Sequence, residues 1–265
     1  MQNIKEYVLI KKNNLKLLID KLEVKPCLSI VQVGDNPASN SYVKGKMKDC
    51  DEVGIKCNHL KLDENISQEF LNDTIISLNS NSMINGIIVQ LPLPKHLNLN
   101  LDLINKEKDV DGFKIDSPFV PCTPLGIIKY LEDNNVEFDG KNVVVIGRSD
   151  IVGKPMAKLF QDRNATVTIC HSHTKDISFY TRNADIIVVA TGKINTLKRD
   201  MIGNNKPIVI DVGINRNENG KLCGDCDYSN IIDICSFVSP VPGGVGLLTR
   251  LSLLENVKKT LDYLH

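Results

Sequence analysis

The chain has 265 residues, with 32 lysines and arginines against 32 aspartates and glutamates, so its formal net charge at neutral pH is zero. This balance excludes the basic field that nucleic acid or an anionic membrane surface requires, and no apolar run reaches the length of a membrane span. We therefore expect a cytoplasmic protein of two domains whose partners are small molecules.

The eight cysteines are scattered along the chain, mostly within apolar segments. Cys27, Cys170 and Cys235 lie in strand-like runs, which predicts reduced, buried thiols and no disulfide framework. Cys223 and Cys226 have the spacing of a metal-binding pair, but no second pair lies at a suitable distance. We therefore predict no metal site.

Strand-like and helix-like segments alternate along the chain, which predicts parallel sheets with crossover helices on both faces. The expected strands are residues 27–33, 55–62, 84–90, 143–146, 165–170, 185–190 and 207–213. A proline-rich break at 108–124 separates two such units, so the expected fold is α/β with two lobes. We place residues 1–116 and 246–265 in the first domain and 117–245 in a Rossmann-like second domain, with the apolar C-terminal helix packing back on the first lobe.

The segment VVVIGRSDIVGKP, residues 143–155, indicates where a nucleotide would bind. Four β-branched residues predict a buried strand, Gly147 allows a sharp turn, and Gly153 allows close packing where a helix begins. Dinucleotide-binding domains hold a pyrophosphate at such a strand, turn and helix amino-terminus. The spacing departs from the usual glycine fingerprint, so an ordinary strand-to-helix turn is the alternative.

The next strand, 165–170, favours NADP over NAD. NAD-binding domains usually place an acid after this strand to bind the ribose 2′-hydroxyl, but the first carboxylate here is Asp176, several residues later. Ser172, a potentially cationic His171 and Arg148 of the preceding turn suit a 2′-phosphate, because a guanidinium matches phosphate oxygens in a bidentate fork.

A helix expected to end near Gly54 carries three polar residues on one face. Ser39, Tyr42 and Lys46 are spaced i, i+3 and i+7. A separate apolar stripe would face the sheet: Val43, Met47 and Cys50. The polar face is therefore available for a flat ligand that stacks on the tyrosine, although a solvated helix face is the alternative for this common spacing.

Three further segments strengthen the ligand interpretation. Gln90 ends a buried strand just before Pro92, where a carboxamide would be wasted on packing. Asp109 and Asp111 lie beside a glycine turn, and the loop at 238–246 is rich in glycine and proline, which lets a backbone approach a ligand closely.

The chain resembles the FolD-like family of bifunctional methylenetetrahydrofolate dehydrogenase/methenyltetrahydrofolate cyclohydrolases. The collinear segments that carry the resemblance are VGDNPASNSYVKGK, GIIVQLPLP, KDVDGF, PCTPLG, GRSDIVGKP, TVTICHSHT, DIIVVATGK, VIDVGIN, GDCDY and VSPVPGGVG. The resemblance implies NADP-dependent oxidation of 5,10-methylenetetrahydrofolate, hydrolysis of the methenyl product to 10-formyltetrahydrofolate, and a homodimer formed through the nucleotide domain. It also implies that the first domain is the catalytic, folate-binding one.

The resemblance also implies residue roles in the folate site. Lys46 would be the general acid/base of the hydrolytic step, Tyr42 would stack on the folate, and Gln90 would orient Lys46. Asp111 would bind the donor edge of the pterin. The remaining residues implied to line the pocket are Ser39, Pro242 and Gly246.

On the cofactor side, the residues implied to contact NADP are Gly147, Arg148, Ser149, Ser172 and Ile214. Arg148 and Ser172 would lie at the 2′-phosphate. Two departures from the family pattern are the sequence GLLT at 246–249, where the family usually has GPMT, and the lack of a glycine-containing strand before residue 26.

Two other functions stay open: an NADP-linked dehydrogenase without the hydrolytic step, and a non-catalytic NADP- or folate-binding module. Retention of Lys46, Tyr42 and Gln90 argues against the first, and separate assays of oxidation and hydrolysis would distinguish all three. A free lysine has a pKa of about 10.4, so Lys46 must be desolvated or lie near positive charge to act as a base at neutral pH.

Overall fold

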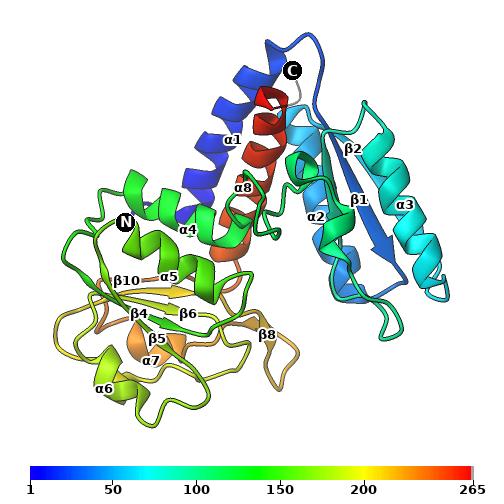
Figure 1. Ribbon diagram of the computed structural model, residues 1–265. Helices are drawn as coiled ribbons and strands as arrows, with labels where there is room; N and C mark the ends of the chain where they lie inside the picture. Colours follow the sequence, from blue (N-terminus) through cyan, green and yellow to red (C-terminus); the bar gives the residue numbers. More distant parts are fainter. Residues whose placement is uncertain (264–265) are drawn as a thin grey trace. The chain divides into compact units, whose positions relative to one another are not determined.

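The computed structural model describes residues 1–263 and divides into two compact units. Unit 1 comprises residues 1–8 and 123–249, and unit 2 comprises residues 9–122 together with the described residues from Arg250 onward. Two long helices are divided between the units, α1 (Ile4–Asp20) and α8 (Val245–Lys259), and the first residue of α4 (Cys122–Asp133) also belongs to unit 2 (Figure 1). Each unit is described separately below.

Unit 2 contains a three-stranded parallel sheet in the order β2-β1-β3. Its strands are β1 (Cys27–Val33), β2 (Lys56–Leu62) and β3 (Gly86–Val89). Leu28 pairs with Cys57 on one side and with Gly86 on the other. The crossover helices are α2 (Pro37–Val53) and α3 (Gln68–Ser80), and short 3₁₀ turns follow at Leu101–Leu103 and Lys106–Lys108. The three strands predicted for the first half of the chain are confirmed.

The sheet of unit 2 is buried on both faces because successive side chains of β1 point in opposite directions. Leu28 and Ile30 belong to a core cluster that includes residues of α2 and α8, whereas Val31 and Val33 pack with α3. The α8 residues in the first cluster are Leu253, Leu254 and Val257. The prediction that the C-terminal helix packs on the first sheet is therefore confirmed, and each such buried side chain contributes about 1.5–3 kcal/mol.

Unit 1 contains a five-stranded parallel sheet in the order β10-β7-β6-β4-β5. Its strands are β4 (Asn142–Ile146), β5 (Thr166–Cys170), β6 (Ile186–Val189), β7 (Ile208–Asp211) and β10 (Phe237–Val238). Its helices are α4 (Cys122–Asp133), α5 (Gly153–Gln161), α6 (Ile177–Thr181) and α7 (Tyr228–Ile231), with a 3₁₀ turn at Arg199–Met201. A small antiparallel hairpin joins β8 (Asn215–Arg216) to β9 (Leu222–Cys223). The four strands predicted for the second half are confirmed.

The same strand order appears at the centre of both sheets. In each unit the first strand lies between the second and the third, β1 between β2 and β3, and β4 between β5 and β6. The chain therefore reverses its direction of winding between β1 and β3, and again between β4 and β6. Ligands of open α/β sheets bind at such switch points, beyond the carboxyl ends of the strands.

Helix α1 is the main element that the sequence analysis did not predict. It buries Ile4, Tyr7, Leu15 and Ile19, which lie on one face at helical spacing. Its first residues belong to unit 1, because Tyr7 packs edge-on against Tyr130 with ring centroids 5.1 Å apart.

Two smaller differences concern Cys235 and the C-terminal helix. Cys235 lies in a bend before β10 and not in a strand as expected, because the chain still has to turn into that strand. Helix α8 ends at Lys259 and a 3₁₀ turn follows at Thr260–Asp262, so the expected helical residues 264–265 lie outside the described part of the chain. Within residues 1–263, no helix has the length and apolar character needed to cross a membrane.

Candidate active site

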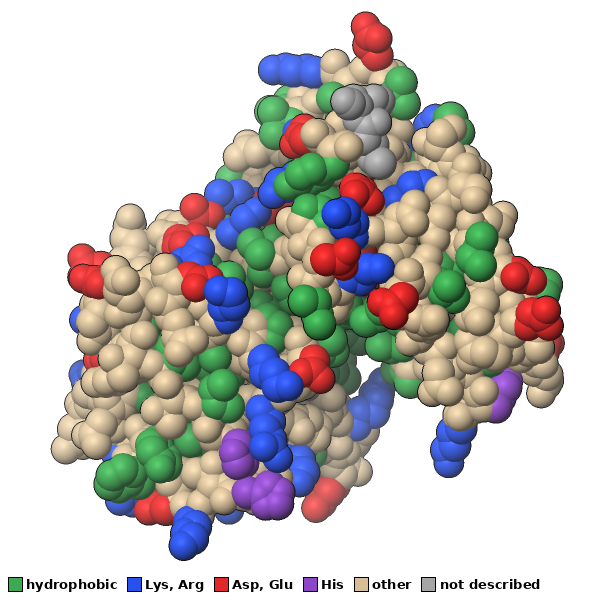
Figure 2. Space-filling view, viewed as in Figure 1, with side chains coloured by type: hydrophobic (Ala, Val, Ile, Leu, Met, Phe, Trp, Pro, Cys, Tyr) green, Lys and Arg blue, Asp and Glu red, His purple; other side chains and the backbone are tan. Residues whose placement is uncertain are grey.

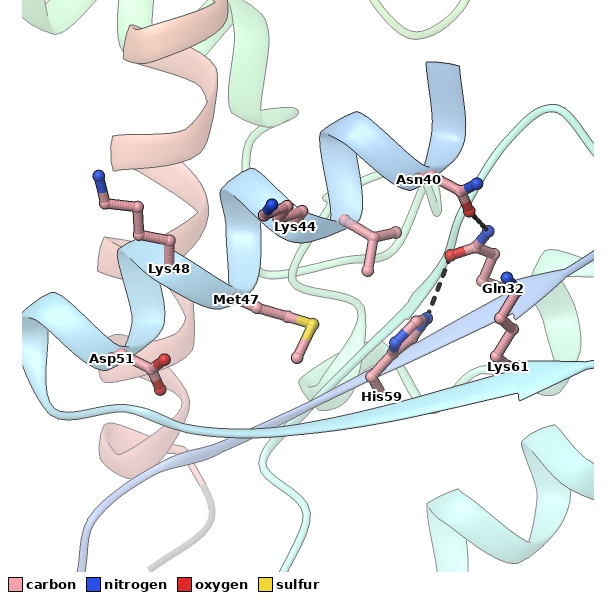
Figure 3. A pocket seen from close by; sticks show the side chains of 9 residues that line it. Gln32, Asn40, Lys44, Met47, Lys48, Asp51, His59 and Lys61 are labelled. Atoms are coloured by element: carbon pink, nitrogen blue, oxygen red, sulfur yellow. Dashed lines mark hydrogen bonds between the residues drawn. The ribbon is translucent and has the colours of Figure 1, made fainter. Parts of the chain in front are cut away.

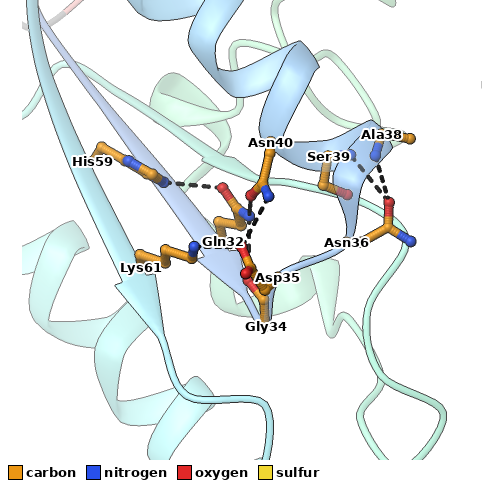
Figure 4. A network of polar contacts seen from close by, with 9 residues as sticks. All are labelled: Gln32, Gly34, Asp35, Asn36, Ala38, Ser39, Asn40, His59 and Lys61. Atoms are coloured by element: carbon orange, nitrogen blue, oxygen red, sulfur yellow. Dashed lines mark hydrogen bonds and ion pairs between the residues drawn. The ribbon is translucent and has the colours of Figure 1, made fainter.

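Helix α2 is fixed at the carboxyl end of β1 by a polar network (Figure 4). Asn36 caps the helix by accepting hydrogen bonds from the backbone N–H groups of Ala38 and Ser39 at 2.9 and 3.1 Å. Asn40, one turn into the helix, accepts from Nε2 of the buried Gln32 at 2.6 Å and donates to Asp35 at 2.8 Å. The first turn of α2 is thus tied to β1 and to the loop between them.

The polar face predicted on α2 is present in the structure. Ser39 is buried, and its Oγ has no hydrogen-bond partner among residues 1–263. Tyr42 lies one turn later and is 36% exposed, so its ring can be reached by a ligand. A buried hydroxyl without a partner is costly, and a ligand that bonds to Ser39 would remove that cost.

Lys46 and Gln90 meet at the switch point of this sheet. The Lys46 Nζ donates a hydrogen bond to Oε1 of Gln90 at 3.1 Å. Gln90 is held in turn by its backbone N–H, which donates to Val31 at 2.8 Å, and by Nε2, which donates to the carbonyl of Leu91 at 2.7 Å. The carboxamide oxygen therefore faces the amine, and the structure brings these two predicted residues together.

Asp111 lies in the electrostatic range of the same amine. Burial raises the pKa of its carboxyl, the Lys46 ammonium lowers it, and Asp109 raises it further. Asp109 is itself buried and accepts the backbone N–H of Lys114 at 2.8 Å, so it serves the local turn. Among the described residues, the Asp111 side chain accepts no hydrogen bond, and its carboxyl is the one on which the Lys46 charge acts. The structure therefore groups Ser39, Tyr42, Lys46, Gln90 and Asp111 within unit 2.

A separate cavity of about 320 Å³ lies on the other flank of α2, between that helix and β2 (Figure 3). Val43 and Met47 contribute its apolar wall, and His59 of β2 contacts Oε1 of Gln32 at 3.1 Å. Lys48 and Lys61 line the cavity but already pair with Glu52 and Asp35. Lys46 and Tyr42 do not line this cavity, so it is distinct from the site at Gln90.

In unit 1, Gly147 and Gly153 bring three backbone segments into close contact. Gly147 has φ +127°, and a Cβ placed there would lie 2.3 Å from the carbonyl oxygen of Ala190, after β6. A Cβ at Gly153, the first residue of α5, would lie 2.3 Å from the carbonyl oxygen of Gly147. Neither position can hold a side chain without moving backbone.

The turn between β4 and α5 offers hydrogen-bond donors to an anion. Within the described chain, the backbone N–H groups of residues 148–152 donate to no other group. The Ser149 Oγ accepts a long bond of 3.4 Å from Gly153, and α5 begins there. Donors at a helix amino-terminus fit a pyrophosphate, as the sequence predicts.

The groups predicted for a 2′-phosphate lie after β4 and β5. Arg148 and Ser172 are exposed, and Figure 2 shows basic side chains beside the histidines of this unit. His171 accepts the backbone N–H of His173 at Nδ1 (3.2 Å), and partial burial, Arg148 and His173 all lower its pKa. These effects favour the neutral form of the ring, in which Nδ1 accepts and the Nε2–H is left to donate, and the role predicted for His171 at a 2′-phosphate stays a prediction. The Asp176 carboxylate caps α6 by accepting the backbone N–H of Phe179 at 3.3 Å. It is therefore already used and does not serve as the acid that would bind a ribose 2′-hydroxyl in an NAD site.

The sequence analysis missed two buried aspartates that organise the loops after β6 and β7. Asp211 accepts the backbone N–H groups of Gly213, Asp225 and Cys226 at 2.9–3.0 Å. Asp225 accepts the N–H groups of Thr191 and Gly192 at 2.6 and 2.9 Å. Burial raises the pKa of Asp211, and these donors oppose that effect.

Asp225 also reaches the loop that contains Ile214. The Asn215 Nδ2 donates to Asp225 at 2.8 Å, and the neighbouring Ile214 is left 46% exposed. An apolar side chain held in this way could pack on a ring system. The motif GDCDY contained Asp225, but only the fold could show what its carboxylate contacts.

The remaining predicted residues, Pro242 and Gly246, belong to unit 1, whereas the Lys46 group belongs to unit 2. The Val241–Pro242 peptide is cis, and Gly246 has no atom within 4 Å of a built Cβ. Among the residues that the structure describes, no group of three or more histidine, cysteine or acidic side chains is arranged to hold a metal ion.

The fold and these two sites define a class: a two-domain α/β protein with an NAD(P)-type unit and a second unit that carries a lysine at its switch point. Residues 2–111 match the catalytic domain of tetrahydrofolate dehydrogenase/cyclohydrolase, and residues 121–264 match the NAD(P)-binding domain of the same family. The chain belongs to the tetrahydrofolate dehydrogenase/cyclohydrolase family, which confirms the resemblance stated from its motifs.

Individual relatives agree with this assignment. The chain is 51% identical to the bifunctional protein FolD of Campylobacter hominis, over 94% of this chain and 91% of that one. A crystal structure of the bifunctional FolD of Campylobacter jejuni matches with a TM-score of 0.94 and 44% identity, covering 98% of both chains. The Trypanosoma brucei enzyme, solved with NADP and an inhibitor, matches with a TM-score of 0.93 and 31% identity over 99% of this chain and 97% of that one.

Proposed function

We propose that this protein is a bifunctional enzyme of one-carbon folate metabolism. It oxidises 5,10-methylenetetrahydrofolate with NADP and hydrolyses the resulting 5,10-methenyltetrahydrofolate to 10-formyltetrahydrofolate. The observation that carries the proposal is the 3.1 Å hydrogen bond between the Lys46 amine and the Gln90 carboxamide at the switch point of unit 2. A dehydrogenase that performs only a hydride transfer has no need for this pair.

The residues of unit 1 fit NADP. The N–H groups after Gly147 and the start of α5 suit the pyrophosphate, while Arg148, Ser172 and the Nε2–H of His171 suit the 2′-phosphate. When bound, NADP supplies the hydride acceptor. The contribution of this chain to that step is positioning, because the methylene carbon gives up a hydride without a strong base.

The hydrolytic step requires proton transfer, and Lys46 is the residue that we assign to it. Water adds to the methenyl carbon and loses a proton, which gives a neutral carbinolamine. The bond from that carbon to one ring nitrogen then breaks, the nitrogen gains a proton, and the hydroxyl loses its proton to form the formyl C=O, so one proton is released to solvent overall. Lys46 accepts the first proton and returns one to the nitrogen, with its amine oriented by Gln90.

The other residues of the proposed site bind substrate. Tyr42 stacks on the aromatic part of the folate, the unpartnered Oγ of Ser39 bonds to it, and Asp111 accepts from the donor edge of the pterin. We also assign Pro242 and Gly246 to the folate pocket. In terms of domains, residues 1–116 with 246–265 bind folate and residues 117–245 bind NADP.

We also propose a cytoplasmic homodimer formed through unit 1. Strand β5 is an edge strand whose residues are mostly exposed or half-buried, and Ile169 on it is 38% exposed. Edge strands of this kind pair with a second chain unless they are protected. The eight cysteines are free, as suits a reducing compartment. Sedimentation of the protein and of the Ile169→Lys variant tests the dimer, which the lysine should dissociate.

Two separate assays test the enzyme function. The first follows methylenetetrahydrofolate oxidation with NADP or NAD, and the second follows methenyltetrahydrofolate hydrolysis without any nucleotide. We expect both activities, with NADP preferred. Oxidation alone would mean a monofunctional dehydrogenase, and the absence of both would mean a binding module. Either of those results would overturn the proposal.

A further inference from the structure

Gly45 in the middle of α2 has a specific structural role. Glycine is unfavourable in a helix interior relative to alanine, so its presence there needs a reason. A Cβ at Gly45 would lie 2.0 Å from Nη1 of Arg250, on α8. The missing side chain therefore leaves the space in which the Arg250 guanidinium lies against α2. Both residues belong to unit 2.

Arg250 is held in this position by a charged cluster. Its Nε lies 2.9 Å from Oδ2 of Asp49, and Lys12 lies 2.5 Å from the other oxygen of that buried carboxylate. Lys12 also pairs with Glu52, which lies 3.7 Å from Lys48. Among the pairs that the structure describes, three cations therefore share two carboxylates, so Arg250 has no carboxylate to itself.

The guanidinium lies on the same helix face as Tyr42. Tyr42, Gly45 and Asp49 are spaced i, i+3 and i+7, and the last two contact Arg250 directly. Burial raises the pKa of the Tyr42 hydroxyl and the Arg250 charge lowers it, so the two side chains are electrostatic neighbours. The Arg250 side chain is 25% exposed, which leaves it accessible to a ligand that lies on Tyr42.

We propose that Arg250 binds a carboxylate of the glutamate tail of the folate substrate. This inference rests on the proposed function, because it takes Tyr42 as the surface on which the aromatic part of the substrate stacks. In a reduced folate, the aminobenzoyl ring is attached to a glutamate. When that ring stacks on Tyr42, the carboxylates of the glutamate lie near the same face of α2. A guanidinium matches a carboxylate in charge and in planar geometry.

The test removes either the guanidinium or the glutamate. KM and kcat of the dehydrogenase are measured for 5,10-methylenetetrahydrofolate and for 5,10-methylenetetrahydropteroate, which lacks the glutamate. The variants are Arg250→Met, Gly45→Ala and both together, with Lys44→Met as a control that removes a cation lining the other flank of α2. Equilibrium binding of both 5,10-methylene compounds is measured by calorimetry in the absence of NADP, where neither is oxidised, so that the comparison does not depend on turnover.

Arg250→Met should raise KM and Kd for the glutamyl compound roughly tenfold or more and leave the truncated compound unchanged within about twofold. Gly45→Ala should have a smaller effect of the same kind, because it displaces the guanidinium and keeps its charge, and it should add nothing to Arg250→Met. Equal losses for both compounds would show that Arg250 only holds α8 on α2, and unchanged binding would also overturn the inference. Failure of the wild-type protein to oxidise either compound would instead contradict the proposed function, and the binding arms would still test Arg250.

Discussion

The two candidate sites occupy equivalent places in their sheets but are built from different chemical groups. In unit 2, the switch point between β1 and β3 is lined by side chains, and those of Lys46 and Gln90 are hydrogen-bonded to each other. In unit 1, the switch point between β4 and β6 is lined by backbone. Gly147 and Gly153 admit no side chain there, and the N–H groups of residues 148–152 have no hydrogen-bond partner in the described chain.

This difference follows from what each site has to do. A proton must be taken up and released during hydrolysis, and only a titratable side chain can do that. A pyrophosphate must be bound without any change in charge state, and fixed backbone dipoles are sufficient for it. The same topology therefore supports chemistry in one unit and binding in the other, and substitutions should affect the two sites in different ways.

The largest expected effect is that of Lys46→Met on hydrolysis. General acid–base groups contribute about 10²- to 10⁴-fold to rate, so methenyltetrahydrofolate hydrolysis should fall by at least that much. NADP affinity, measured by fluorescence titration, should be unchanged because unit 1 is intact. Gln90→Glu is the informative companion, since it keeps a hydrogen-bond acceptor beside the amine. Hydrolysis at the wild-type rate by Lys46→Met would remove Lys46 from the mechanism.

Gly147→Ala should act on unit 1 through the backbone. Alanine is strained at φ +127°, and its Cβ would lie 2.3 Å from the Ala190 carbonyl, so we expect a loss of about 3 kcal/mol in the free energy of unfolding. NADP binding should weaken in the fraction that stays folded. Gly140→Ala is the matched control: its φ is +69° and no atom lies within 4 Å of a built Cβ, so only about 1 kcal/mol should be lost. Equal unfolding midpoints for the two variants would contradict the close approach of Gly147 to the Ala190 carbonyl.

Arg148→Met should separate the two nicotinamide cofactors. The guanidinium has a role only if a 2′-phosphate is present, so KM for NADP should rise roughly tenfold or more while KM for NAD stays the same. Steady-state dehydrogenase kinetics with each cofactor measure this directly. A parallel rise for both cofactors would instead place Arg148 at the pyrophosphate.

Much of this architecture could be predicted because it is encoded locally. Runs of β-branched residues predicted the strands, and the spacing of Tyr42 and Lys46 predicted their common face on α2. Gly147 was predictable as a turn because a glycine after a buried strand has few other uses. The amphipathic pattern of α1 was also present in the sequence, at Ile4, Tyr7, Leu15 and Ile19, but it was not recognised.

The parts that escaped prediction depend on contacts between residues far apart in the chain. From the sequence alone, Gly45 is only an unfavourable residue in the interior of α2. Its role becomes evident from the Arg250 guanidinium, which occupies the space that a side chain at position 45 would need. Similarly, nothing in the local pattern around Asp225 indicates that its carboxylate will bond to Thr191 and Gly192 after β6. Such contacts follow from strand order, which a single sequence constrains only weakly.

Asp225→Asn tests whether that network matters for the nucleotide site. In the wild type, one Asp225 oxygen accepts from the Thr191 and Gly192 N–H groups and the other accepts from Asn215. An asparagine amide has only one oxygen, so its NH2 group must face one of these two sets of donors, and the hydrogen bonds on that side are lost. Because buried charge-assisted bonds are lost, we expect KM for NADP to rise about tenfold, with little change in hydrolysis, which uses side chains of unit 2. Asp227→Asn is the control, since the Asp227 carboxylate accepts only from Asn230 within the described chain. If the two substitutions alter NADP binding equally, Asp225 is not needed to hold the loops after β6 and β7 in position. The backbone of unit 1 would then be sufficient to form the NADP site without the Asp225 carboxylate.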